Sequence, residues 1–302
     1  MAYQWELGED IETGIHRIIT EQINHALSQL KDDTNDRDEA VHEARKSFKK
    51  IRAVLRLVRD EVGEDYYQEK NIFYRDLGRE LSPLRDAYMM VEVMDNLIKE
   101  LDDKTLKKTA KSLRKQLIAD YKEIQQAFWA SGQAVSNVIE ALETESPNVE
   151  EIPISHDSFK AFKKGLRRVY KRGQDRMTIA YDNVPSPEGF HDWRKRVKYL
   201  WYHMRLLEPV YPAHFTALIA QLDELADLLG VAHDMAVLYD YLEALPETDD
   251  GNERLLLAYL DHKRGELEIS AQPFGEAIFA DDPKTFAKQI KKWWKNPQPI
   301  IA

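Results

Sequence analysis

The sequence predicts an all-α protein. Apolar residues recur at intervals of three and four over long stretches of the 302-residue chain, which is the period of a helix that buries one face. Gly and Pro occur mostly between those stretches, and the alternating pattern typical of strands is nearly absent. A chain of this length can bury a substantial hydrophobic core without disulfides, consistent with its lack of cysteine.

The periodic stretches divide into two series of six. We expect helices first at 9–31, 38–61, 65–80, 84–101, 103–131 and 134–144, and then at 156–181, 187–208, 212–229, 232–245, 252–270 and 283–295. Loops are expected where turn-forming residues gather, at 32–36, 146–153, 183–189 and 246–252.

Several classes of protein are excluded at this point. Without cysteine there can be no thiolate metal site and no cysteine nucleophile. The acidic N-terminal stretch MAYQWELGEDIETG resembles neither a secretory signal nor a transit peptide. The longest strongly apolar run, near 255–260, is far shorter than the roughly 20 residues of a membrane helix. We therefore expect a soluble, cytoplasmic protein with no membrane partner.

The two series contain a repeated segment. Residues 41–58 read VHEARKSFKKIRAVLRLV and residues 190–207 read FHDWRKRVKYLWYHMRLL, so His, Arg and Lys coincide at a constant offset of 149. Further on, LSPLRDAYMMVEVMDNL (81–97) aligns with LGVAHDMAVLYDYL (229–242), which places Asp86 opposite Asp234. This pattern indicates an internal duplication into two related helical bundles with pseudo-twofold symmetry, residues 1–148 and 149–302.

Each copy predicts a helix with one apolar face and one basic face. The apolar positions, spaced by three and four, are Val41, Ala44, Phe48, Ile51, Leu55 and Val58 in the first copy and Phe190, Trp193, Val197, Leu200, Met204 and Leu207 in the second. The basic residues follow other faces of the same helices. A third basic helix, HDSFKAFKKGLRRVYKRGQDR, opens the second half at 156–176.

Positive charge is concentrated in these three helices. Residues 42–59, 156–176 and 191–205 hold 20 Lys and Arg against four Asp and Glu, whereas the whole chain has a net charge of −10. Like charges along one helix face cost stability unless an anion or an acidic surface neutralises them. The pattern favours a polyanion site with basic groups spaced for successive phosphates, about 5–10 Å apart.

At these residues the sequence resembles the CHAD domains, helical domains named for their histidines. The stretches VHEARKSFKKIR and FHDWRKRVKYLW match the family pattern of His, two residues, Arg and further basic residues. GLRRVYKRGQDRM (165–177) and LSPLRDA (81–87) resemble two further family signatures. The resemblance covers nearly the whole chain, so we expect a single CHAD domain over 1–302.

The resemblance implies a basic surface that binds inorganic polyphosphate. Carried over position by position, it implies these ligands: His42, Arg45, Lys46, Lys49, Arg52, Arg56, Lys160, Lys164, Arg167, Arg168, Lys171, Arg172, His191, Arg194, Lys195, Lys198 and Arg205. Three departures are evident. Trp201 stands in the place of Arg52, His233 in that of Arg85, and the counterpart of the third basic helix in the first half (11–30) carries little charge. We therefore expect a surface that binds more strongly on the second half.

The two matched histidines leave more than one role open. With an ordinary pKa near 6.5, His42 and His191 could gain a proton beside a phosphate and strengthen binding at mildly acidic pH, which a comparison between about pH 6 and 8 would reveal. They could equally cap their helices or satisfy buried polar contacts. A metal site is disfavoured, because His42 and Glu43, like His191 and Asp192, are adjacent and point about 100° apart. We therefore expect no cofactor and no bound metal, other than divalent cations carried by the polymer.

Catalysis is not expected. The sequence has no Glu-x-Glu-x-Lys strand of the triphosphate-processing modules that accompany some CHAD domains, no phosphate-binding P-loop and no HExxH. The alternatives are binding of nucleic acid, with Trp193, Tyr199 and Trp201 stacking on bases, and a scaffold that docks an acidic protein through its basic face or through KKWWKNPQP (291–299). The overall acidity disfavours nucleic acid. The sequence leaves open whether the protein resides on polyphosphate granules.

Overall fold

The computed structural model describes residues 3–32, 34–182, 185–245 and 251–298 and confirms the all-α class, since these residues contain no strand. None of the described helices is long and apolar enough to cross a membrane. The α-helices are α1 (Ile11–Lys31), α2 (Arg37–Leu57), α3 (Arg59–Val62), α4 (Glu64–Glu80), α5 (Ser82–Glu100), α6 (Lys104–Ser131), α7 (Gln133–Glu145), α8 (Lys160–Ala180), α9 (Pro187–Leu207), α10 (Pro212–Glu243), α11 (Asn252–Ile278) and α12 (Pro283–Lys295). Two short 3₁₀ helices are η1 (Ser146–Glu151) and η2 (Glu208–Val210).

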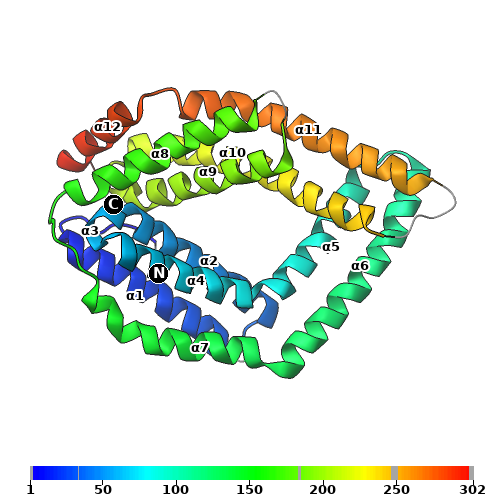
Figure 1. The fold of residues 1–302 in the computed structure, drawn as a ribbon, viewed down its shortest axis with the longest axis horizontal. Helices are drawn as coiled ribbons and strands as arrows, with labels where there is room; N and C mark the ends of the chain where they lie inside the picture. Colours follow the sequence, from blue (N-terminus) through cyan, green and yellow to red (C-terminus); the bar gives the residue numbers. More distant parts are fainter. Residues whose placement is uncertain (1–2, 33, 183–184, 246–250, 299–302) are drawn as a thin grey trace.

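The helices pack around two hydrophobic cores. Figure 1 shows α5, α6 and the adjoining ends of α10 and α11 on the right, with the other helices on the left. The larger core includes Trp5, Phe48, Phe162 and Trp193. The smaller core includes Met94, Leu117, Leu238 and Leu260. Both cores therefore draw residues from 1–148 and from 149–302.

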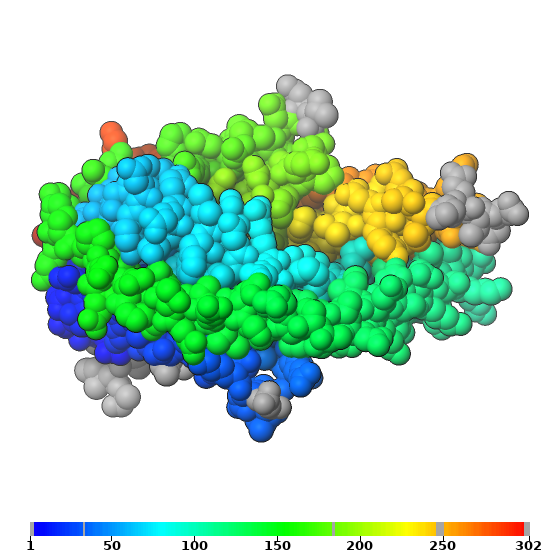
Figure 2. All heavy atoms as spheres, turned by 60° about the horizontal axis from the view of Figure 1, so that its bottom comes forward, coloured from blue at the N-terminus to red at the C-terminus, as the bar shows by residue number. Residues whose placement is uncertain are grey.

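Contacts between α5 and α10 also connect the two halves of the chain. Figure 2 shows the face on which α5 (cyan) meets α10 (yellow-green to yellow). The halves consequently share their packing, and their origin by duplication stays a prediction.

The predicted apolar faces of α2 and α9 are confirmed, because all twelve positions are buried. The N-terminus of α2 is capped by Asp36, whose carboxylate accepts hydrogen bonds from the backbone N–H groups of Asp38 and Glu39. Ser186 caps α9 by accepting from the N–H of Gly189. Burial of one face turns the other faces of both helices outward, and those faces carry the basic residues.

Four of the predicted helix and loop boundaries differ from those in the structure. The predicted helices at 212–229 and 232–245 form one continuous helix, α10, and α11 continues past Pro273 to Ile278. The predicted loop at 146–153 begins with η1. The helix expected at 38–61 ends at Leu57, and the short α3 follows it. Gly63 then turns the chain into α4 with φ of 83°, a conformation that favours glycine.

One close crossing places α8 beside α2. A Cβ atom on Gly165 would lie 2.0 Å from the carbonyl oxygen of Leu57, so only glycine allows α8 to approach the end of α2 this closely. The expected loop at 246–252 lies largely outside the described residues.

Candidate functional site

The basic residues of α2 and α9 meet around Lys49. The Lys49 side chain reaches solvent, yet its pKa is lowered to about 8. The largest cause is desolvation by the surrounding protein, and the positive charges of Arg45, Arg194, Lys198 and Arg85 contribute the rest. These five residues, which we call the central cluster, come from α2, α5 and α9. The structure thus brings cations from both copies of the motif to one place.

Two arginines of the central cluster are held by specific contacts. A guanidinium N–H of Arg45 donates to the carbonyl oxygen of Gly78, and Arg45 lies 3.7 Å from Asp86. The guanidinium of Arg194 lies over Gly230, where an added Cβ would be 3.4 Å away. Arg194 of α9 therefore packs against α10 at this point.

A second acid lies near the central cluster. Burial raises the pKa of Asp234, although Arg194, Arg85 and Lys49 act to lower it. Asp86 and Asp234 face these cations, Arg85 pairs with Glu92 at 3.3 Å, and Lys198 lies 4.0 Å from Asp223, so acids offset part of the positive charge.

The two motif histidines have different neighbours. Burial, together with the positive charges of Arg85, Lys46 and Lys49, lowers the pKa of His42 to about 4. The ring of His191 instead stacks on that of His233, with centroids 3.9 Å apart.

Both partners of the stack have lowered pKa values. Burial is the largest cause for each, and it lowers the pKa of His233 to about 4. His42 and His233 are consequently neutral at pH 7 in the free protein. Protonation of His42 on binding a phosphate stays a prediction. For it to occur between pH 6 and 8, the bound phosphate would have to raise the pKa of His42 from about 4 into that range.

A second basic group lies towards the C-terminal end of α2. Arg52 Nε and Arg56 Nη2 both donate to Asn71 Oδ1, at 3.1 and 2.9 Å. The guanidinium carbon of Arg56 lies 3.7 Å from the centre of the Tyr199 ring, and that of Arg196 lies 5.6 Å from it. Burial raises the pKa of Tyr199, but these surrounding cations lower it by more. The ring of Tyr199 thus contacts a basic residue of α2, Arg56, and one of α9, Arg196.

The six predicted residues of α8 divide between two faces. Arg168 forms an ion pair with Asp60. Burial, followed by the charges of Arg196, Arg59 and Arg168, lowers the pKa of Arg172. These two arginines therefore lie near the second basic group.

The other four predicted residues of α8 lie on the helix face opposite to its buried residues: Lys160, Lys164, Arg167 and Lys171. Lys171 is paired there with Asp175 at 2.9 Å. The side chains of these four residues point away from α2 and α9.

The remaining predicted ligands are partly neutralised. Lys46 pairs with Glu43 at 2.5 Å, and Lys195 pairs with Asp192 at 2.9 Å. The Nζ of Lys198 lies 4.1 Å from the centre of the Trp201 ring, and Arg205 lies 4.7 Å from the same ring. Trp201 matches Arg52 of the first copy. It contributes no charge of its own, but its ring contacts the cations of Lys198 and Arg205.

Several residues of this surface were not among the predicted polyphosphate ligands: Arg85, Arg196, Tyr199, Asn71, His233 and Asp234. Arg85 had a signal, since it belongs to the LSPLRDA stretch, and Arg196 lies within a basic helix. Asn71 had none, because its role depends on the packing of α4 against α2.

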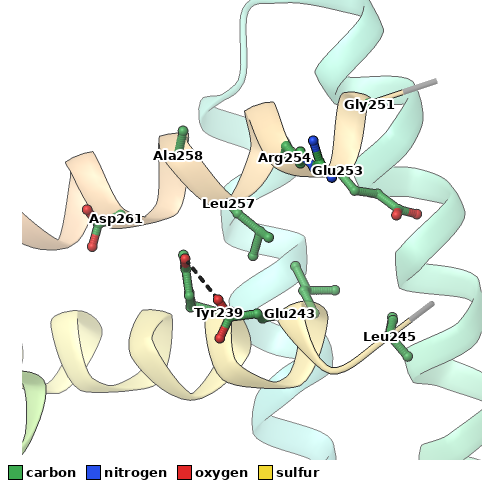
Figure 3. Close-up of a pocket in the computed structure, with 10 residues that line it drawn as sticks. Tyr239, Glu243, Leu245, Gly251, Glu253, Arg254, Leu257, Ala258 and Asp261 are labelled. Carbon is green, nitrogen blue, oxygen red and sulfur yellow. Dashed lines mark hydrogen bonds between the residues drawn. The ribbon is translucent and has the colours of Figure 1, made fainter. Parts of the chain in front are cut away.

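A cavity elsewhere in the fold has the opposite character. It measures about 660 Å³ and lies between the end of α10 and the start of α11 (Figure 3). Glu243, Glu253 and Asp261 contribute to its lining, and Tyr239 donates to Glu243 at 3.4 Å. With these acids in its wall, this cavity does not suit a polyanion.

Fold and site together define an all-α protein in which two histidine-led helices bring basic side chains together. Comparison with family models gives a match to the CHAD domain over residues 17–243. The chain therefore belongs to the CHAD domain family, which confirms the resemblance seen in the sequence.

Two solved structures have the same fold as this chain. The CHAD domain from the plant Ricinus communis superposes with a TM-score of 0.56 and 16% identity, over 99% of this chain and 96% of that one. PptA from Streptomyces chartreusis superposes with a TM-score of 0.55 and 16% identity, over 93% of this chain and all of that one. At this identity the likeness shows the fold alone. A search of curated proteins gives no match.

Proposed function

We propose that this protein binds inorganic polyphosphate on the α2–α9 surface and does so without catalysing a reaction. The observation that carries the proposal is the convergence of cations on Lys49. Arg45 and Arg85 from one half and Arg194 and Lys198 from the other lie close enough to lower the pKa of its ammonium group. Such a cluster is stabilised by a ligand that places several negative charges in a row.

Polyphosphate suits this surface because it carries about one negative charge per phosphate along a linear chain. Its binding should be driven by ion pairs and by release of counterions, so that affinity falls steeply with salt, as it does for a nucleic-acid backbone. Divalent cations carried by the polymer would compete with the basic side chains for its oxygens.

Nucleic acid fits less well, since aromatic rings are the usual platform for unpaired bases. Trp193 is fully buried. Arg56 covers one face of Tyr199, and Lys198 lies over the ring of Trp201.

Docking of an acidic protein through the C-terminal tryptophans is also disfavoured. The Trp294 ring packs against Trp5 and Phe162, at 5.2 and 5.4 Å between centroids. Trp293 lies 5.2 Å from Phe215. Both rings are engaged with the helical bundle.

Calorimetric titration tests the proposal. Wild-type protein should bind long-chain polyphosphate more tightly than single-stranded DNA or RNA of matched charge, and the affinity should fall steeply between about 50 and 200 mM salt. The double variant Lys49→Glu/Arg194→Glu should lose most of this affinity. The control Lys108→Glu/Lys111→Glu reverses two exposed lysines of α6 and should bind nearly as wild type. Equal affinity of wild type and the Lys49 double variant would overturn the proposal.

A further inference from the structure

Polar side chains converge where the chain enters α8 from the linker between the two halves. Nδ1 of His156 lies 2.7 Å from a carboxylate oxygen of Glu61 in α3, and the hydroxyl of Ser155 donates to the same oxygen at 2.8 Å. The other ring nitrogen, Nε2, lies 2.5 Å from Nζ of Lys160, the first residue of α8. Glu61, His156 and Lys160 therefore form one hydrogen-bonded chain, and none of them belongs to the central cluster.

The state of Glu61 determines which nitrogen of His156 carries the proton. Only 6% of the Glu61 side chain is exposed, and this burial raises its pKa, but hydrogen bonds from His156 and Ser155 lower that pKa by more. The carboxylate is therefore ionised at pH 7 and can only accept hydrogen bonds. Nδ1 must then be the donor, which leaves Nε2 of the neutral ring as an acceptor facing Lys160.

This order of groups is the arrangement that activates a nucleophile. A nucleophile within hydrogen-bond reach of a base, with the base oriented by a third group, is the general form of the Ser-His-Asp triad. Here the Lys160 amine is the nucleophile, the His156 imidazole is the base, and the Glu61 carboxylate holds the ring. Lys160 is exposed, so a reagent from solvent can reach its nitrogen.

We propose that Lys160 is a reactive lysine that is acylated by acyl phosphates, with His156 as the base and Glu61 as a positioning residue. An acyl phosphate suits this place because the exposed Lys163 and Lys164 lie about one helical turn from Lys160 and attract its negatively charged phosphate. The inference rests on the hydrogen-bond geometry and does not depend on the proposed binding of polyphosphate.

The proposed step moves the acyl group from oxygen to nitrogen. His156 Nε2 accepts a proton from the Lys160 ammonium group, which frees the electron pair of the amine. The nitrogen then attacks the acyl carbonyl carbon, so that a C–N bond forms and the C–O bond to phosphate breaks, with its electron pair leaving on the phosphate. Of the two protons that the ammonium group loses, one ends on this phosphate and the other in solvent. The product is an uncharged amide at position 160.

The same helix contains two lysines without this arrangement. Lys163 and Lys164 are also exposed, and within the described part of the chain neither hydrogen-bonds to an imidazole, as Lys160 does. They lie about one turn from Lys160, so they meet the same reagent in a similar electrostatic environment. A higher rate at Lys160 therefore reports the effect of His156 and not that of the surrounding charge.

Acetylation of the purified protein by acetyl phosphate, stopped at low conversion, tests the assignment. Chymotrypsin cleaves after Phe162 and so separates Lys160 from Lys163 and Lys164 for mass spectrometry. In wild type, Lys160 should be acetylated at least about tenfold faster than either neighbour. His156→Gln, which removes the basic nitrogen from a half-buried position, should keep the fold and reduce Lys160 to the rate of its neighbours.

Two further variants sharpen the test. Glu61→Gln should slow Lys160 by less than His156→Gln does, and it should weaken the preference for a proton on Nδ1, which the ¹⁵N chemical shifts of the ring report. The control His262→Gln replaces an exposed histidine of α11 that pairs with Glu266, and it should change neither measurement. Equal rates at Lys160 and its two neighbours in wild type, or an unchanged rate at Lys160 in His156→Gln, would overturn the assignment.

Discussion

The helices α2 and α9 carry the same basic motif in two different surroundings. Lys49 of α2 is surrounded by cations, whereas its counterpart Lys198 lies 4.0 Å from Asp223 and over the ring of Trp201. Likewise, His42 is near Arg85, while His191 stacks on His233. A shared motif therefore does not give each half the same charge, because the neighbouring helices supply different partners.

This difference bears on which half should bind more strongly. The sequence favoured the second half because of the charges on α8. The structure turns Lys160, Lys164 and Lys171 outward, away from the central cluster. The expectation of a stronger second half therefore loses the support of these three lysines, and which half binds more strongly stays a prediction.

The largest expected effect is on stability and concerns Trp193, which occupies in α9 the buried position that Ala44 occupies in α2. The ring of Trp193 is fully buried and lies so close to Gly275 that a Cβ there would be 2.5 Å from it. Trp193→Ala should therefore lower the free energy of unfolding by about 3–5 kcal/mol. Trp201→Ala, in the same helix but half-buried, should cost clearly less. Urea denaturation measures both, and equal losses would show that α9 does not depend on this contact.

The next effect compares the two matched lysines. Reversal of Lys49 removes a charge at the centre of the cationic cluster, so Lys49→Glu should weaken polyphosphate binding by about 10- to 100-fold at low salt. Lys198→Glu should cost only a few-fold, because Asp223 and Asp227 already offset that charge. Titration calorimetry at about 50 mM salt distinguishes the two. A larger loss of polyphosphate affinity in Lys198→Glu than in Lys49→Glu would indicate that the second half binds more strongly.

The smallest effect concerns the histidines. Burial is the main cause of the low pKa of His42, with Arg85 the next, so Arg85→Ala should raise that pKa only part of the way from about 4 towards 6.5. His191→Ala should raise the pKa of His233 in the same manner. Titration of the ring C–H signals by NMR measures both shifts. An unchanged pKa in each variant would mean that burial alone sets these values.

These low pKa values also fix the sign of a pH effect on stability. An unfolded histidine takes up a proton near pH 6.5, whereas His42 and the buried His203 do so at about pH 4 when folded. The unfolded state therefore binds more protons between these values, and the free energy of unfolding should decrease as pH falls from about 6.5 to about 4. In Arg85→Ala the decrease should be smaller.

Much of the fold was predictable because helical periodicity is local information. The spacing of Val41, Phe48 and Leu55 correctly indicated a buried face, as did that of Trp193 and Leu200. The joining of 212–229 and 232–245 into the single helix α10 was not predicted, because a glycine in the sequence favours a helix end.

The sequence by itself determined the all-α class, the buried faces of α2 and α9 and the concentration of positive charge on them. These features follow from the order of residues along single helices. Only the tertiary structure decided which side chains meet, namely Lys49 with Arg194 and His25 with Glu43. The physical reason is that periodicity assigns a residue to a face of its own helix, whereas electrostatic contacts between helices depend on which other helix packs against that face.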